Sequence, residues 1–314
     1  NSTYPISVSS ERISQATAIA RYAREIGADS LCHGSTGAGN DQVRFDMIFN
    51  IVAPEIEVIA LIREKRLSRE EEIEYLRSHG VDFDFKKAEY SINQGIWGTS
   101  VGGKETLTSG ETLPEEAYPS QLKETEPRRV TLTFERGEFV ALDGKRYDDR
   151  IAAIQALQAV ASRYAVGRDM HVGDTIIGIK GRVGFEAAAP MVIIKAHHML
   201  EKHTLTKWQL FWKDQISAFY GNHLHEGQYY DPVMRDMEAM LESSQRTVSG
   251  DVYVDLHPYR FVVVGIDSPH DLMSNRFGAY GETMSDWTSE DVKGFGRIFG
   301  NQNKIYYQVN KEKL

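Results

Sequence analysis

The sequence predicts an α/β protein with a mainly parallel sheet in its first part, followed by a domain of different composition. In roughly the first ninety residues, helical spacing of apolar residues alternates with short apolar runs, as in strand–helix–strand units. From about residue 88 glycine and threonine become frequent, and a stretch rich in proline and glutamate follows at residues 114–127. A chain of 314 residues has room for one large domain or two ordinary ones of roughly 100–200 residues.

The first domain is predicted to alternate helices and strands. Apolar residues recur three or four apart over residues 11–26, as in a helix, and Gly27 is placed to end it. A short strand over residues 30–33 then runs into a glycine-rich turn. The elements predicted next are a helix over residues 42–52 that stops before Pro54, a buried strand over 57–61, and a helix over 68–78 with Ser68 as N-cap and Glu71 completing a capping box.

The second domain is predicted to begin after Lys87. Two strand-like runs, at residues 130–134 and 139–142, flank a turn and predict a hairpin, and amphipathic spacing predicts a helix over 149–166. The remaining predicted elements are a strand over 172–179, helices over 186–202, 207–227 and 231–244, a strand pair over 252–255 and 260–266, and a helix over 289–298 that is followed by a tail.

The composition excludes several classes of protein. Lys and Arg total 36 against 45 Asp and Glu, so the net charge is −9, whereas nucleic-acid binding requires a basic surface. The single cysteine, Cys32, cannot form an internal disulfide, which favours a reducing compartment. No apolar stretch approaches the roughly 18 residues of a membrane-spanning helix, and no signal segment is recognisable. We therefore expect a cytoplasmic protein that binds neither nucleic acid nor membrane.

The strongest local signal for a ligand site is the turn from Gly34 to Asp41. There a predicted strand runs through three glycines and several polar residues into the start of a helix. Free backbone N–H groups and the helix dipole favour an anionic ligand at such a place, and glycines let the ligand approach the backbone. The alternative is a tight turn that only caps the helix, and composition alone does not decide between the two.

A second candidate segment covers residues 90–100, in which Ser91 and Ser100 bracket glycines and Trp97. Hydroxyl groups on irregular backbone suit a small polar ligand. The alternative is a glycine-rich interdomain linker whose tryptophan fills a gap in the core.

The histidines do not predict a metal site. Zinc-binding histidines on a helix sit four residues apart on one face. His197 and His198 are adjacent, and His223 and His225 are two residues apart, so neither pair converges.

The segment from His33 to Phe45 resembles the signature His-Gly-x-Thr-Gly-x-Gly-Asn-Asp-Gln-Val-Arg-Phe of argininosuccinate synthases. The resemblance covers essentially the whole chain, because further segments match the family in the family's order. These segments are Tyr4 and Ser9 with Glu11-Arg12-Ile13, Tyr90-Ser91 with Trp97-Gly98-Thr99-Ser100, Val166-Gly167-Arg168-Asp169, and Gly178-Ile179-Lys180.

The resemblance implies an α/β fold of three parts. Residues 1–87 are expected to form a partial, adenine nucleotide alpha-hydrolase-like nucleotide-binding domain, residues 88–285 an α+β synthetase domain that binds citrulline and aspartate and contributes to oligomerisation, and residues 286–314 a C-terminal helix and tail. The family carries a Ser-Gly-Gly-x-Asp-x-Ser loop that grips the pyrophosphate of ATP, and these residues contain none. We therefore expect the chain to begin inside the nucleotide-binding domain and to have weak or no activity by itself.

The implied activity is a two-step ligation in arginine biosynthesis. ATP, accompanied by Mg²⁺, adenylates the ureido oxygen of citrulline, and the amine of aspartate displaces AMP to give argininosuccinate. The resemblance also implies a homotetramer. A reading of another class is a noncatalytic, truncated remnant that acts as an amino-acid-binding module or as an oligomer partner.

Residue roles carried over by the resemblance concern binding alone, and no catalytic residue is assigned. Gly34 is expected to contact the nucleotide, and Thr36, Asn40 and Asp41 the aspartate. Citrulline is expected to contact Tyr4, Ser9, Asn40, Arg44, Ser91 and Ser100.

Two departures from the family pattern concern the amino-acid end of citrulline. This chain has Gly173-Asp174 where the family usually has Glu followed by Asn, and Phe185 where it has Tyr. A carboxylate suits a free ammonium group but is needless beside an acylated nitrogen that carries its own carboxyl group. We therefore expect an N-acylated citrulline such as N-succinylcitrulline. Plain citrulline is the competing hypothesis, in which Asp174 replaces the missing Glu from one residue away.

Overall fold

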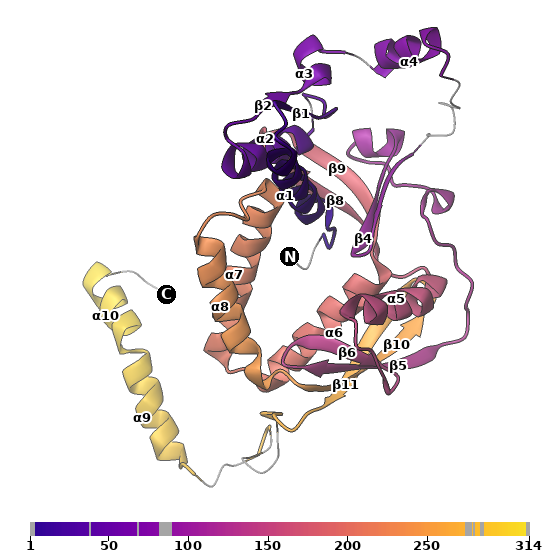
Figure 1. Cartoon of the computed structure of the whole chain (residues 1–314). Helices are drawn as coiled ribbons and strands as arrows, with labels where there is room; N and C mark the ends of the chain where they lie inside the picture. Colours follow the sequence, from indigo (N-terminus) through magenta and orange to yellow (C-terminus); the bar gives the residue numbers. More distant parts are fainter. Residues whose placement is uncertain are drawn as a thin grey trace. The chain divides into compact units, whose positions relative to one another are not determined.

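The computed structural model describes residues 4–37, 39–67, 69–81, 90–273, 278, 280–282 and 286–311 (Figure 1). The chain divides into two compact units, residues 1–270 and residues 271–314. Within the described ranges, no helix combines the length and the apolar character that crossing a membrane requires. The boundary predicted at Lys87 falls outside the described residues.

The first unit begins with the predicted α/β arrangement, which is confirmed. Strand β1 (Ser30–Cys32) pairs in parallel with β2 (Glu57–Ile59), and helix α2 (Asp41–Val52) connects them. Helix α1 (Val8–Ile26) packs against α2 and β1 because one face of it is apolar and fully buried. The buried residues of that face are Ile13, Ala16, Ala20 and Ala23.

Two predicted boundaries in this region are wrong by a few residues. Helix α1 starts at Val8 rather than at residue 11. Strand β2 stops at Ile59, because Leu61 already begins the short helix α3 (Leu61–Lys65), whose Glu64 side chain accepts a hydrogen bond from the N–H of Ala60. Helix α4 (Arg69–Ser78) confirms the next predicted helix, although its predicted N-cap Ser68 lies outside the described residues.

A four-stranded antiparallel sheet follows in the order β3-β4-β9-β8. Its strands are β3 (Ser91–Gly95), β4 (Gly98–Gly102), β8 (Arg168–Asp174) and β9 (Lys180–Glu186). The glycine-rich segment that the sequence leaves open as a linker is therefore a hairpin of this sheet. Gly98 in its turn has φ +136°, and a Cβ there would lie 2.7 Å from the backbone oxygen of Pro5, so the hairpin packs directly against the segment before α1.

The prediction of one strand over residues 172–179 is wrong. β8 ends at Asp174 and the chain turns back into β9, because Gly178 takes the left-handed conformation (φ +83°) and donates its N–H to the backbone oxygen of Thr175 at 2.9 Å. Glu186, predicted to start a helix, is instead the last residue of β9. It lies opposite Arg168 of β8 and forms an ion pair with it at 2.9 Å.

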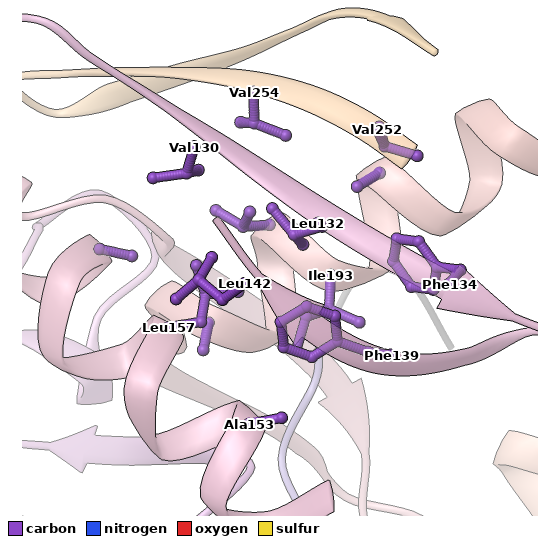
Figure 2. Close-up of a cluster of buried hydrophobic side chains, with 14 of the residues drawn as sticks. Val130, Leu132, Phe134, Phe139, Leu142, Ala153, Leu157, Ile193, Val252 and Val254 are labelled. Carbon is purple, nitrogen blue, oxygen red and sulfur yellow. The ribbon is translucent and has the colours of Figure 1, made fainter. Parts of the chain in front are cut away.

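A five-stranded antiparallel sheet in the order β11-β10-β5-β6-β7 carries the main core. Figure 2 shows apolar side chains of β5, β6 and β10 gathered with those of helices α5 and α6. Both predicted strand pairs of this region are confirmed. The elements are β5 (Arg128–Glu135), β6 (Glu138–Leu142), β7 (Lys145–Arg146), β10 (Gly250–His257), β11 (Arg260–Asp267), α5 (Arg150–Ala161) and α6 (Ala188–Thr204).

The remaining helices follow the predicted order with two corrections. The helix predicted over residues 149–166 ends at Ala161, because a 3-10 turn follows and Ala165 takes a left-handed conformation. The tail predicted after residue 298 contains a second helix. The helices are α7 (Lys207–Glu226) and α8 (Val233–Ser244) in the first unit and α9 (Ser289–Phe299) and α10 (Asn301–Asn310) in the second, with 3-10 turns at Lys104–Leu107, Glu115–Ala117, Ser162–Tyr164 and Gln245–Thr247.

Gly167 provides a test of how the sheet is joined to its neighbours. It precedes β8 with φ +78°, and a Cβ there would lie 2.6 Å from the backbone oxygen of Ala187. Gly167→Ala is expected to lower the free energy of unfolding by about 3 kcal/mol, through left-handed strain of about 1–2 kcal/mol and a clash with backbone. Urea unfolding measures the loss. Gly144→Ala is the matched control, because Gly144 has the same φ and no atom within 4 Å, and equal losses would contradict the argument.

A buried polar cluster around Glu201 joins α6 to α7. The Glu201 side chain is fully buried, Lys213 donates to its Oε2 at 2.6 Å, and Gln245 donates to its Oε1 at 2.9 Å. Burial by itself raises the pKa of Glu201. The hydrogen bond with His198 and the charges of His197 and Lys213 outweigh burial and lower this pKa to about 2.

This lowered pKa predicts a pH-dependent stability. The stabilisation is present above the ordinary carboxyl pKa of 4.5 and is lost as the pH falls toward 2; the shift corresponds to roughly 3 kcal/mol. Glu201→Gln is expected to lose about that amount at pH 7, and the gap to the wild type should narrow below pH 4.5. Denaturant unfolding at pH 7 and at pH 3 tests this, with the exposed Glu242→Gln as control. A gap that stays constant with pH would refute the assignment.

Candidate functional site

A cavity of about 1300 Å³ lies in the first unit. It is lined by the start of α1, the loop between β1 and α2, one face of the four-stranded sheet and the last turn of α7. Segments far apart in the sequence thus meet at one place, as expected of a ligand site.

The loop after β1 is held by side chains of α2. Gln42 is buried, and its Nε2 donates to the backbone oxygens of Gly37 at 2.6 Å and Gly39 at 3.3 Å. On the other side, Nδ1 of His33 accepts a hydrogen bond from the N–H of Ser35 at 3.2 Å, and its Nε2 lies 3.0 Å from Asp46. These contacts hold Ser35, Gly37 and Gly39 of the loop in place.

Asn40 and Asp41, at the start of α2, connect the loop to two other walls of the cavity. The Asn40 side-chain oxygen accepts from the N–H of Ile176, in the turn after β8, at 2.9 Å. Both oxygens of Asp41 are used, because Arg12 of α1 donates to Oδ2 at 2.9 Å and Arg44 donates to Oδ1 at 3.0 Å. The two guanidinium groups thus fix the direction of this carboxylate.

Arg44 extends this network to α7. Its side chain is buried, and its Nε and Nη2 donate to the backbone oxygen of His225 at 3.0 and 2.7 Å. Burial lowers the pKa of Arg44, and the charge and hydrogen bond of Asp41 counteract that. Burial and the charge of Arg44 also lower the pKa of His225, against a hydrogen bond to the backbone of Asp174 that raises it.

Tyr4 lines the cavity and packs on the four-stranded sheet. Its ring stacks on His171 with centroids 4.2 Å apart and planes 2° apart, and it meets the ring of Phe185 edge-on at 5.4 Å. Burial raises the pKa of Tyr4, against a hydrogen bond with Ser100 and the charge of Arg44. The phenol therefore remains protonated at neutral pH and is able to donate a hydrogen bond.

Two rows of cross-strand neighbours lie on the sheet face toward the cavity. One row includes the polar residues Asn93 and Ser100, and the other consists of Gly173 and Gly181. Asn93, Ser100 and Phe185 lie directly opposite one another on β3, β4 and β9, so their side chains share a face. Further along, Gly173 of β8 lies opposite Gly181 of β9, where neither residue adds a side chain. The space beside Gly173 is taken by the imidazole of His171, because a Cβ built on Gly173 would lie 2.7 Å from its Nε2.

The candidate residues mostly meet at this cavity. Ser91 and Phe185 are not in its wall: Ser91 lies two residues before Asn93 on β3, and Phe185 is 1% exposed beneath Tyr4. Those in the wall are Tyr4, Ser9, Gly34, Thr36, Asn40, Asp41, Arg44, Ser100, Gly173 and Asp174.

Six charged or titratable residues of the wall are not among the predicted site residues: Arg12, His33, His171, Arg182, His225 and Glu226. Arg12 lies in a segment that matches the family, but no role was inferred for it. His171 lies in no motif, and His225 was considered only as a metal ligand. Only the pairing of distant elements brings Arg12, His171 and His225 to the cavity.

Comparison with known proteins gives a consistent result over the whole chain. Residues 1–82 match the family model described as Arginosuccinate synthase N-terminal HUP domain. Residues 90–306 match the model described as Arginosuccinate synthase C-terminal domain.

Individual relatives carry the name argininosuccinate synthase. The protein of Dictyoglomus turgidum is 35% identical over 305 residues, covering 96% of this chain and 76% of the relative. That of Methanocaldococcus jannaschii is 33% identical over 313 residues, covering 99% and 78%. That of Xanthomonas campestris pv. campestris is 37% identical over 322 residues, covering 98% and 78%. The chain therefore spans about three quarters of the length of these relatives.

Arg44→Lys tests the network that joins α2 to α7. Lysine keeps the charge but lacks the planar fork that reaches Asp41 and His225 together, so a loss of about 2 kcal/mol in unfolding free energy is expected. Arg24→Lys is the matched control, because Arg24 pairs with Glu55 on the surface and is more than half exposed. It should change stability by less than about 0.5 kcal/mol. Similar losses in both variants, measured by urea unfolding, would contradict the buried network.

Proposed function

This chain belongs to the argininosuccinate synthase family, and we propose that it joins a citrulline-type ureido group to the amine of aspartate while ATP is cleaved to AMP and pyrophosphate. Family membership makes it an ATP-dependent C–N ligase of arginine biosynthesis. The proposal rests on one observation: a single cavity is lined by the signature loop, by Tyr4, by the start of α1, and by Asn93 and Ser100 of the sheet.

The proposed ligation has two steps, adenylation of the ureido oxygen and displacement of AMP by the aspartate amine. The ureido oxygen attacks the α-phosphorus of ATP, a P–O bond forms, and pyrophosphate leaves. The aspartate amine then attacks the ureido carbon, the bond from that carbon to the AMP oxygen breaks, and a proton leaves the nitrogen. Holding two substrates beside an activated intermediate accounts for a large share of such catalysis.

The loop after β1 is the proposed nucleotide contact, through Gly34. A Cβ at Gly34 would meet no atom within 4 Å, so the backbone is open to a close approach. In the described part of the chain, no three His, Cys, Asp or Glu side chains lie close enough to hold a metal ion. We assign Mg²⁺ to the phosphates of the nucleotide, which carry oxygen ligands that this ion prefers.

Aspartate is assigned to Thr36, Asn40 and Asp41, at the start of α2. The Asp41 carboxylate is an acceptor for the aspartate ammonium group, and Arg12 and Arg44 fix its direction. Backbone N–H groups at the start of α2 and the hydroxyl of Thr36 in the loop before it suit the aspartate carboxylates.

Citrulline is assigned to the space between Tyr4 and the sheet. Ser9 lies in the first turn of α1, whose Ser7 makes no side-chain cap, so first-turn N–H groups remain for the citrulline carboxylate. Tyr4 adds a protonated phenol and Ser100 adds a hydroxyl of the cavity wall. The expected contact with Ser91 is not supported, because Ser91 lies outside that wall. Asn40 and Arg44 stand at the ureido end; Arg44 acts mainly by holding Asp41, since its guanidinium is largely engaged.

The citrulline is proposed to be N-acylated, for example N-succinylated. The Gly173–Gly181 row offers no carboxylate for a free ammonium group. Asp174 does not supply the missing charge, because its carboxylate pairs with Lys180 at 2.6 Å and is two-thirds exposed. Phe185 has no hydroxyl and is buried. Plain citrulline remains the competing substrate, and the assay below separates them.

Assembly and organisation are proposed to follow the family. We propose the divisions 1–87, 88–285 and 286–314, a cytoplasmic location and a homotetramer. Large exposed apolar side chains on α7 and α9 support an assembly, because such surfaces are usually covered. They are Trp208, Phe211, Trp212 and Phe219 on α7, and Val292, Phe295, Ile298 and Phe299 on α9.

A pyrophosphate-release assay tests the function. The 314-residue chain and the complete product of its gene are each supplied with ATP, aspartate and either citrulline, N-acetylcitrulline or N-succinylcitrulline. We expect release that requires aspartate and an acylated citrulline, with kcat/KM about tenfold or more above that for citrulline, because a buried ammonium lacks a paired charge here. Full turnover with citrulline and no gain from acylation would refute the N-acyl proposal alone.

If neither protein releases pyrophosphate with any of the substrates, the ligase proposal is refuted. Calorimetric binding of citrulline or aspartate without turnover would then favour the noncatalytic amino-acid-binding module.

Asp41→Asn should lower kcat/KM by about 100-fold, because a charged pair to the aspartate ammonium is lost. Asp214→Asn, an exposed carboxylate outside the cavity wall, should leave it unchanged.

A further inference from the structure

His171 occupies a place in the cavity that the assigned roles leave unused. It lies on β8 two residues before Gly173, and alternate residues of a strand share a face, so both face the cavity. Its cross-strand partner is Val183, and the bare Gly173–Gly181 row begins beside it. His171 therefore places a polar side chain directly beside the Gly173–Gly181 row.

The imidazole fills the space that a side chain at position 173 would need. A Cβ built on Gly173 would lie 2.7 Å from Nε2 of His171, which is too close for both to remain in place. Stacking on the Tyr4 ring holds the imidazole in this orientation. Gly173 and His171 thus form one steric unit: the imidazole of His171 occupies the space that a side chain at position 173 would take, so the ring fits only while residue 173 is glycine.

The ring nitrogens are available to a ligand. Over the described ranges of the chain, neither nitrogen of His171 has a hydrogen-bond partner, although the residue is only partly exposed. Burial lowers the pKa of His171 against the charge of Asp169, so the uncharged ring dominates at neutral pH. An uncharged imidazole offers one donor and one acceptor, which matches an amide N–H or C=O but offers no counter-charge to an ammonium group.

We propose that His171 determines which citrulline derivative this cavity accepts, by standing in the space of residue 173 and offering an imidazole nitrogen to the acylated amino group of the substrate. The inference rests on the proposed function. Tyr4 links the two, because the residue assigned to the amino-acid end of citrulline is the one that stacks on His171.

Binding measurements separate this role from a structural one. Calorimetry is used with citrulline and N-succinylcitrulline as probes, on His171→Phe, His171→Asn and the wild type. Phenylalanine preserves the stack on Tyr4 but has no nitrogen, so the preference for N-succinylcitrulline is expected to fall about tenfold. Asparagine keeps a hydrogen-bond donor and an acceptor, so His171→Asn is expected to retain part of the preference for N-succinylcitrulline. His270→Ala, a histidine outside the cavity wall, is the control and should keep the wild-type preference.

A second pair of variants tests the steric unit. Gly173→Glu with His171 in place should weaken binding of both probes, because the new Cβ meets the ring. The double variant His171→Ala/Gly173→Glu removes that clash and restores a carboxylate, so it should prefer citrulline over N-succinylcitrulline by about tenfold. Circular dichroism melts establish that each variant is folded before its affinity is compared.

The outcomes are distinct. If His171→Phe keeps the wild-type preference, or if the double variant still prefers N-succinylcitrulline, the role of His171 is overturned and the ligase proposal stands. If the wild type prefers plain citrulline, the role is overturned together with the N-acyl proposal. If the complete gene product binds neither probe and releases no pyrophosphate, the proposed function itself fails, and this inference fails with it.

Discussion

The arrangement of the cavity depends on the buried guanidinium of Arg44. It donates to Asp41 within its own helix and to the backbone oxygen of His225 at the end of α7, nearly two hundred residues away in the sequence. A buried cation is stable only where its donors are satisfied, so α2 and α7 must approach in one geometry. Since Arg12 shares Asp41, the start of α1 is fixed by the same charge network.

A second constraint comes from glycines at close backbone approaches. Gly98 lets the β3–β4 hairpin pack against Pro5, and this contact brings Tyr4 to the sheet. Gly167 lets the start of β8 pass the backbone of Ala187. Both have positive φ, so they fix the direction of the chain as well as the spacing. The Gly98 contact places the N-terminal segment beside the sheet face where Tyr4 stacks on His171.

The two walls of the cavity are held in different ways. The loop after β1 is held by short-range hydrogen bonds from Gln42 and His33, within about ten residues along the chain. The opposite wall is formed by long-range strand pairing, in which β8 and β9 bring Gly173 and Gly181 opposite one another.

The sequence by itself determined the features that depend on local spacing. The helices with a buried apolar face, the parallel β1–α2–β2 start, both strand pairs of the larger sheet and the identity of the signature loop all follow from residues close together in the chain. Only the tertiary structure decided that residues 172–179 turn at Gly178, that the glycine-rich segment is a hairpin, and that Arg12, His171 and His225 line the cavity. The reason is that sheet register and buried charge pairs join residues distant in sequence, and no local pattern records which distant partner a strand or a charge will meet.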